Sequence, residues 1–399
     1  MAVSRGWRGW LGPASPALTF VLTMGVVNLF GDITYEGGAS INGPFMGALG
    51  ASAAIISITA GAGEFLGYAL RSVAGYVADR SGKYWLVTFI GYAINLLAVP
   101  AMALAGSWQA AAALILAERI GRAMRKPTVE AMLSYTTGEL GRGWAYAVNT
   151  ALDEIGATVG PLVIALVLLL NGDYRTGYAL LSISAVLALA SLTVARIRYP
   201  LPSRLEQGRT AEAKGFTAAY WFYMLAGACF AAGLMSFELI SYHLSVSKTV
   251  PDHWIPVFLA IATGFGVIVS LVLGRLYDRV GLPVVLVAVV LSSGFSPLVF
   301  LGGFQVALAG MLLWGIGYAT QDTLLKAVVA GELPEGQRNL AFGLFYAGYG
   351  VGWLIGSIAT GLLYERSLVG LIVFAVAAQL ASLPAFVLAG RQGRATARS

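Results

Sequence analysis

Long apolar runs separated by short polar segments occupy most of the chain from residue 16 to residue 390. Twelve of these runs reach about the 20 residues that a helix needs to cross roughly 30 Å of hydrocarbon. Helices are expected because a segment in lipid must satisfy its own backbone hydrogen bonds. The predicted spans are 16–36, 51–76, 84–105, 108–127, 144–170, 174–195, 217–241, 254–277, 282–302, 304–329, 340–364 and 368–390.

The composition supports a membrane protein rather than a soluble one. Of the 399 residues, 58% are hydrophobic and only 11% are charged, whereas soluble domains carry roughly a quarter charged residues. A soluble fold could not bury this much apolar surface, so a very apolar soluble enzyme is disfavoured. We therefore predict an all-α integral membrane protein with twelve transmembrane helices.

The basic residues predict the orientation in the membrane. Nineteen of the 25 Lys and Arg residues fall at the ends and loops on one side, and three, Arg175, Lys248 and Arg366, fall on the other. Positive residues accumulate on the cytoplasmic side, so both termini are predicted to be cytoplasmic in the plasma or inner membrane. This topology also accounts for the net charge of +6, and we expect no nucleic-acid partner.

Two similar stretches half a chain apart indicate an internal repeat. "GYVADRSGKYW" begins at Gly75, and "GRLYDRVG" begins 199 residues later at Gly274. A second alignment without gaps, at an offset of 196, pairs Gly156 and Gly160 with Gly352 and Gly356. The chain is thus predicted to form two six-helix bundles in the same orientation, at 1–195 and 217–399, joined by a polar cytoplasmic linker at 196–216. Parallel halves are a transporter architecture, with the site between them near the midplane.

The two charged turns resemble the G-x-x-x-D-R-x-G-[K/R] signature of the major facilitator superfamily. The residues that match are Gly75, Asp79, Arg80, Gly82 and Lys83 in the first copy, and Gly274, Asp278, Arg279 and Gly281 in the second. The resemblance implies the fold of that superfamily and a latch that holds the halves together on the cytoplasmic side. We expect Asp79 to bind backbone donors at a helix start or to pair with Arg122 or Arg125. The alternative is a solvated turn that only fixes the topology.

The fifth span contains "GATVGP", with Gly156, Gly160 and Pro161. It resembles the G-x-x-x-G-P core of the motif of drug–proton antiporters in this superfamily. The usual Gly pair is replaced here by Leu162, Val163 and Ile164. Small residues at this spacing also serve general helix packing in membranes, which is the alternative.

Charged residues inside spans are costly and are therefore functional candidates. Depth places Glu64 and Glu118 nearest the midplane, and Glu118 shares a helix face with Arg122 and Arg125. Glu36 and Glu238 are expected to be solvated near the outer water. The candidates for proton coupling and the substrate cavity are Glu118, Glu64, Asp153, Glu154, Asp32, Arg119, Arg122, Asp322 and Lys326, the last two also a possible internal ion pair.

These features predict a secondary active transporter of a small organic solute that works by alternating access. We expect proton coupling at Glu118 and favour an efflux antiporter, on the partial antiporter motif and the acidic N-terminal half. The alternative is a proton symporter for an organic anion bound by Arg71, Arg119 and Arg122. A receptor or a lipid-modifying enzyme is a distant alternative. We expect a monomer, since nothing in the sequence demands an oligomer, and no catalytic residues or cofactor, since no nucleophile–base constellation is present. No metal is expected, because the single Cys and two His residues cannot complete a metal shell.

Overall fold

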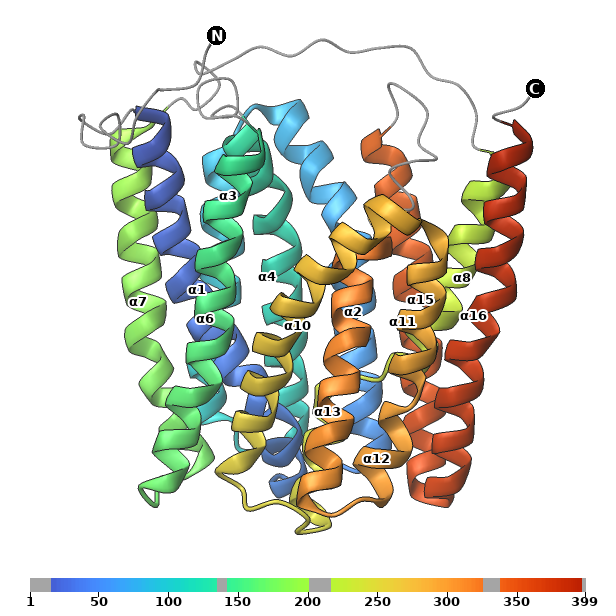
Figure 1. Ribbon diagram of the computed structural model, residues 1–399. Helices are drawn as coiled ribbons and strands as arrows, with labels where there is room; N and C mark the ends of the chain where they lie inside the picture. The colour runs from blue at the N-terminus through green and yellow to red at the C-terminus, as the bar shows by residue number, and fades with distance from the viewer. Residues whose placement is uncertain (1–15, 135–141, 201–216, 326–337, 397–399) are drawn as a thin grey trace, which may run out of the picture.

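The computed structural model describes residues 16–134, 142–200, 217–325 and 338–396, which are almost entirely helical (Figure 1). The first half contains α1 (Pro16–Ala48), α2 (Ala53–Ser81), α3 (Tyr84–Ala101), the short helix η2 (Met102–Leu104), α4 (Trp108–Ser134), α6 (Arg142–Leu169) and α7 (Tyr174–Arg198). The second half contains α8 (Ala218–Leu234), α9 (Phe237–Val246), α10 (Trp254–Val280), α11 (Leu282–Ser293), α12 (Phe295–Leu301), α13 (Phe304–Ala319), the π-helix η4 (Thr320–Leu325), α15 (Arg338–Arg366) and α16 (Leu368–Thr396).

Helices are present at all twelve predicted spans, in the predicted order, and span ten is described as far as Leu325. Several are not single helices: span seven is α8 followed by α9, and span nine is α11 followed by α12. Within the described residues, nine helical segments are long and apolar enough to cross a membrane. The peripheral helices also expose large apolar side chains that water would not favour, including Ile183 and Val186 on α7 and Ile268 and Leu271 on α10. The protein is therefore a multi-pass membrane protein.

The short connections follow local capping chemistry. α2 begins after Ser52, whose side chain accepts a hydrogen bond from the Ile55 backbone N–H, and it ends at Gly82 with a φ of 64°. That left-handed conformation is why a glycine ends the first charged turn. α7 begins after Asp173, whose carboxylate accepts hydrogen bonds from both the backbone N–H and the hydroxyl of Thr176 at 2.7 Å.

The two halves use glycine in the same way. In the first half, Gly156 and Gly160 on α6 lie against the backbone of α1, where an added Cβ would come within 2.5 Å of the Leu29 and Ile33 carbonyl oxygens. In the second half, Gly352 and Gly356 on α15 lie against the α8 backbone at Ala228 and Ala232. The glycines that align in the sequence thus make equivalent contacts. This packing use of "GATVGP" is the one that helix association in membranes predicts.

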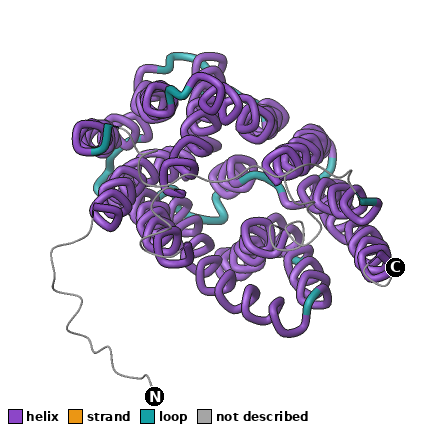
Figure 2. The backbone as a smooth tube through the Cα atoms, turned by 90° about the horizontal axis from the view of Figure 1, so that it is seen from above, coloured by secondary structure: helices purple, strands orange, loops and turns teal. Residues whose placement is uncertain are grey.

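Helices α2 and α15 form much of the seam between the halves (Figure 1). Seen from above, the helices of the bundle are viewed close to end-on (Figure 2). The hydroxyl of Ser57 donates to the backbone oxygen of Ser357 at 2.7 Å, and the Glu365 carboxylate accepts from the Ala54 backbone N–H at 3.0 Å. Both contacts lie toward the face opposite the chain termini, because α2 begins and α15 ends there. The halves are therefore closely joined at that face.

The glycine packing yields a stability prediction. Gly160→Val should lower the free energy of unfolding by about 3 kcal/mol or more, because overpacking at a backbone contact cannot be relieved by moving a side chain. Gly67→Val is the matched control, since an added Cβ there meets nothing within 4 Å. Denaturation of both variants in detergent, followed by loss of helical circular dichroism, measures the difference. Equal stability of the two variants would contradict the packing role.

Candidate functional site

Three arginines on α4, spaced three residues apart, form the centre of the candidate site. Arg119, Arg122 and Arg125 project from adjacent positions on the helix surface toward α2, α1 and α3. Each guanidinium is paired with at least one carboxylate. This agrees with the rule that charges inside a membrane protein face the bundle interior and pair with one another.

Arg119 connects the two halves of the protein. Its guanidinium lies 2.7 Å from Glu64 on α2 and 3.0 Å from Glu238 on α9, so one side chain bridges the N-terminal and C-terminal bundles. Its Nε lies 3.5 Å from Glu118 Oε2, an ion-pair contact without hydrogen-bond geometry. Only 7% of the Arg119 side chain is exposed, so solvent screens these charges little.

A break in span seven places Glu238 at this position. α8 ends at Leu234, and Met235 takes the left-handed region with a φ of 58° before α9 begins at Phe237. The carbonyl oxygen of Met235 accepts a hydrogen bond from the Trp314 indole at 3.1 Å, which satisfies a backbone group freed by the break. The expectation that Glu238 is solvated is therefore wrong, because its side chain is only 6% exposed. Sequence reasoning missed it because "AGLMSF" contains no proline to mark the break.

Arg125 is held by three side chains from two other helices. Its guanidinium lies 3.2 Å from Asp32 on α1 and donates to Asn95 at 3.1 Å and to the Tyr92 hydroxyl at 3.3 Å on α3. Tyr92 in turn donates to Asn28. Such a network stabilises the charge only while all its members are present.

Asn95 joins Arg125 to Glu118. Its amide nitrogen donates to Glu118 Oε1 at 2.6 Å, while its carbonyl oxygen accepts from Arg125. α3 and α4 can approach closely enough for this because Gly91 and Gly121 face the opposite helix, and a Cβ at Gly121 would overlap the Asn95 backbone. Asn95 is fully buried. The sequence analysis did not select it, although an Asn within the apolar run "AINLLAV" is a signal that could have found it.

Arg122 has the loosest pairing of the three. It lies 4.0 Å from Glu36, and its guanidinium sits over the Tyr35 ring at 4.0 Å from the centroid. A quarter of its side chain is exposed, as is 21% of the Glu36 side chain. The prediction that Glu36 is solvated is thus only partly right, because Glu36 also pairs with Arg122.

The ion-paired cluster has more acids than bases. Within the described residues, five carboxylates form ion pairs with the three arginines of α4, which leaves a formal charge of −2 when all are ionised. The carboxylates are Asp32, Glu36, Glu64, Glu118 and Glu238. Excess negative charge in a medium of low polarity favours the uptake of protons or the binding of a cation.

The other predicted site residues have different surroundings. On α6, Asp153 Oδ1 is buried and accepts no hydrogen bond from the described residues, whereas Glu154 is half-buried one position further on. Arg71 lies with its guanidinium 5.0 Å from the Tyr68 ring centroid. The Asp322 side chain and the whole of Lys326 lie outside the residues that the structure describes, so their predicted pairing remains a prediction.

The charged turns differ in part from the expectation. Asp79 accepts a hydrogen bond from the Tyr84 hydroxyl at 2.6 Å, whereas Arg122 and Arg125 face Glu36 and Asp32 in the interior. The predicted pairing of Asp79 with either arginine is therefore not the arrangement in this structure. A Cβ at Gly75 would meet Pro127 at an ordinary 3.6 Å, so close approach does not require that glycine. The remaining turn residues are exposed at Arg80, Gly82 and Lys83 in the first copy and at Asp278 and Arg279 in the second.

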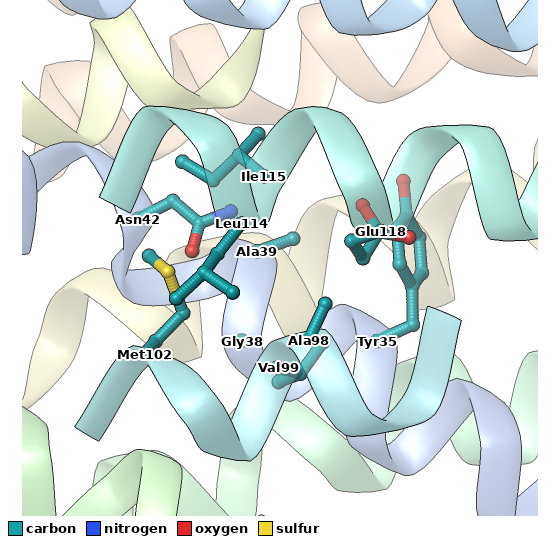
Figure 3. A pocket seen from close by; sticks show the side chains of 10 residues that line it. All are labelled: Tyr35, Gly38, Ala39, Asn42, Ala98, Val99, Met102, Leu114, Ile115 and Glu118. Atoms are coloured by element: carbon teal, nitrogen blue, oxygen red, sulfur yellow. The ribbon is translucent and has the colours of Figure 1, made fainter. Parts of the chain in front are cut away.

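A pocket lies beside the arginine cluster within the N-terminal half (Figure 3). About 230 Å³ between α1, α3, η2 and α4 is not filled by atoms. Tyr35 and Glu118 lie at one end of the pocket and Asn42 and Met102 toward the other. The rest of the lining is small or apolar, so the three polar side chains determine what the pocket can bind.

Comparisons with known proteins agree with this architecture. The family model of the Major Facilitator Superfamily matches residues 19–357 and 219–397. A protein of Mycobacterium tuberculosis is 34% identical over 379 residues, which covers 93% of each chain. An MFS-type transporter of Methanocaldococcus jannaschii is 25% identical over 361 residues, covering 87% of this chain and 89% of that one. The chain belongs to the Major Facilitator Superfamily, and it is a membrane transporter.

Solved transporter structures share the fold. A POT family peptide transporter superposes with a TM-score of 0.75 at 13% identity, covering 94% of this chain and 97% of the other. The nucleoside transporter NupG superposes with a TM-score of 0.71 at 14% identity, covering 94% and 98%. At these identities the similarity extends to the fold and not to the substrate. It confirms twelve transmembrane helices in two six-helix bundles.

The central ion pairs yield a pH-dependent stability prediction. Arg119→Met leaves Glu64, Glu118 and Glu238 without their shared cation, which should cost about 3 kcal/mol or more at pH 8. Much of this loss should return at pH 5, because protons taken up by the carboxylates replace the lost positive charge.

Thermal unfolding in detergent at the two pH values measures this effect. Arg198→Met, at an exposed position near the end of α7, is the matched control and should behave like the wild type. An Arg119→Met deficit of the same size at both pH values would contradict an electrostatic role.

Proposed function

We propose that the protein is a proton-coupled efflux antiporter for a small organic cation. The observation that carries this proposal is the charge balance of the site: five carboxylates are ion-paired with three arginines. The cluster has an excess of two negative charges. Protons could neutralise them, and so could an organic cation. Competition of two cations for one set of carboxylates is the simplest chemistry for an antiporter.

Glu118 is the first candidate for the coupling site. It is buried, it contacts Arg119, and it is linked through Asn95 to Arg125. A proton on Glu118 would weaken both connections, because a neutral carboxyl attracts a guanidinium much less than a carboxylate does. Glu64 and Asp153 follow as candidates. Glu64 contacts Arg119 at 2.7 Å, and Asp153 has a buried oxygen that accepts no hydrogen bond from the described residues.

The contact between Arg119 and Glu238 offers a link from protonation to alternating access. It joins α4 to α9 across the two halves, so the halves cannot separate at this level while both charges remain paired. Protonation of Glu64 or Glu118 changes how strongly Arg119 is held in the N-terminal half. The energy of proton binding can thus shift the equilibrium between conformations.

The charged turns and the topology complete the proposal. Asp79 and Asp278, exposed at the ends of α2 and α10, form the latch when the halves close at the face of the chain termini. That face is cytoplasmic, by the distribution of Lys and Arg. The protein acts as a monomer in the plasma or inner membrane.

Uptake of an organic anion is the second candidate, and the structure supports it less. Arg119, Arg122 and Arg125 are each paired with a carboxylate, so an anion would have to displace an existing partner. Arg71 forms no ion pair with the described residues and is the cation that this alternative would use.

Ligand binding in detergent distinguishes the two candidates. Tetraphenylphosphonium should raise the thermal unfolding temperature, and a ligand at a hundredfold excess over its Kd stabilises by about 2.7 kcal/mol. Binding should release protons into a weakly buffered solution containing a pH dye, because the cation displaces them from the carboxylates. Both the shift and the proton release should be lost in Glu118→Gln.

Benzoate serves as the anionic probe in the second arm of the experiment. Arg198→Gln controls for the loss of a charge far from the site. Stabilisation by benzoate that disappears in Arg71→Gln, without any effect of the cation, would replace the export proposal with anion uptake. Cation binding without proton release would contradict proton coupling.

A further inference from the structure

The pocket shown in Figure 3 is lined by three polar side chains whose hydrogen-bonding capacity is only partly used by the described residues. Glu118 Oε1 is bonded to Asn95 and Asn42 Oδ1 to Tyr178, but Glu118 Oε2 and Asn42 Nδ2 make no hydrogen bond to a described residue. The Tyr35 hydroxyl also makes none. All three side chains line the pocket, and Glu118 and Asn42 are only 5% and 7% exposed. Buried polar atoms in native proteins are nearly always hydrogen-bonded, to water where protein is missing.

The size and chemistry of the pocket suit water. Much of the 230 Å³ is crevice between side chains, and what remains accommodates about one water molecule. Glu118 and Tyr35 offer a water two partners at one end of the pocket, within the usual range of about two to four, and Asn42 offers an amide donor toward the other end. An organic substrate would not fit without a rearrangement of the helices.

The pocket extends from Glu118 toward the face opposite the chain termini. Glu118 is ten residues into α4, so it lies about 15 Å from the end of that helix. Asn42, Met102 and Leu114 lie nearer to that end on α1, η2 and α4. Every lining residue belongs to the N-terminal half, so the pocket bypasses the seam where Arg119 contacts Glu238.

We propose that this pocket is a water site through which Glu118 exchanges its proton with the aqueous phase opposite the termini. The inference rests on the proposed role of Glu118 in proton coupling. The bound species are water and, transiently, hydronium; Asn42 and Tyr35 orient the water by hydrogen bonds, and Glu118 accepts or releases the proton. The proton path then runs inside the N-terminal bundle, while the substrate path runs between the bundles.

The charges around Glu118 come from several elements. They are Arg119, Arg122 and Arg125 on α4, Glu64 on α2, Glu36 on α1 and Glu238 on α9. Among the pocket's lining residues, Glu118 is the only charged one. A proton that enters by the pocket therefore reaches Glu118 before the other carboxylates of the cluster.

Infrared spectroscopy of the full chain in lipid tests the proposal. The difference between wild-type and Glu118→Gln spectra at acid pH isolates the carbonyl band of protonated Glu118. After a change from H₂O to D₂O, the rate at which that band shifts measures the rate of proton exchange at Glu118. Ala39→Val adds two methyl groups to the pocket and should slow the exchange by about tenfold or more, because exchange must then await local opening of the helices.

Ala48→Val is the matched control, since Ala48 is exposed at the end of the same helix, and it should exchange like the wild type. A second variant does not depend on overpacking. Asn42→Cys, in a chain whose only cysteine is replaced by Cys229→Ser, should show slow exchange after Ag⁺ is added. The Cys229→Ser parent should be unaffected by Ag⁺.

The outcomes separate the two proposals. A Glu118 band with unchanged exchange in Ala39→Val, or in Asn42→Cys with Ag⁺, would overturn the water site and leave proton binding at Glu118 intact. Absence of any Glu118 band at all pH values would instead overturn the coupling role. Slower exchange in the two pocket variants alone supports the inference.

Discussion

The arginines of α4 impose the main physical constraint on this protein. A guanidinium in a bundle surrounded by lipid stays charged, so carboxylates must approach it from several directions. Arg119 meets this need with Glu64, Glu118 and Glu238, and Arg125 with Asp32 and two polar side chains of α3. Helices α1, α2, α3 and α9 are therefore placed relative to α4 by electrostatics as well as by apolar packing.

The same constraint makes one contact between the halves depend on the charge of the groups that form it. Contacts such as Ser57 with Ser357 join uncharged groups, and their strength does not change with proton binding. Under the proposed mechanism the contact between Arg119 and Glu238 would change on proton binding, because Arg119 is shared with two carboxylates of its own half. A transporter needs at least one contact of this second kind, since only a contact that depends on ligation can bias one conformation over the other.

Much of the fold could be predicted from the sequence, because hydropathy and the repeat depend on local composition. All twelve spans and the equivalence of Gly156 with Gly352 followed from such patterns. The face of α4 that carries Glu118 and Arg125 also followed, because helical periodicity is local. The buried position of Glu238 could not be predicted, since it depends on the left-handed Met235 and on a hydrogen bond from Trp314, 79 residues away.

The role of Asn95 escaped prediction for a related reason. A single Asn in an apolar span indicates a buried hydrogen bond but not its partners. Those partners depend on how closely α3 approaches α4, which Gly91 and Gly121 decide together. The predicted pairing of Asp79 with Arg122 or Arg125 was wrong for a different reason. The loop and the arginines are near each other in the predicted topology. In the structure, however, the two arginines form ion pairs with Glu36 and Asp32 on α1 instead.

These contacts suggest why proton and substrate paths would be separate. Glu118 is joined to the cluster by its hydrogen bond from Asn95 and its ion pair with Arg119. It also lines the pocket, together with Tyr35 and Asn42. If the only route to Glu118 ran along the seam, a bound substrate would block the proton that must replace it. A route inside one bundle removes this conflict, because it stays open whichever way the two halves are tilted. The small size of the pocket then becomes useful, since it admits water and excludes an organic solute.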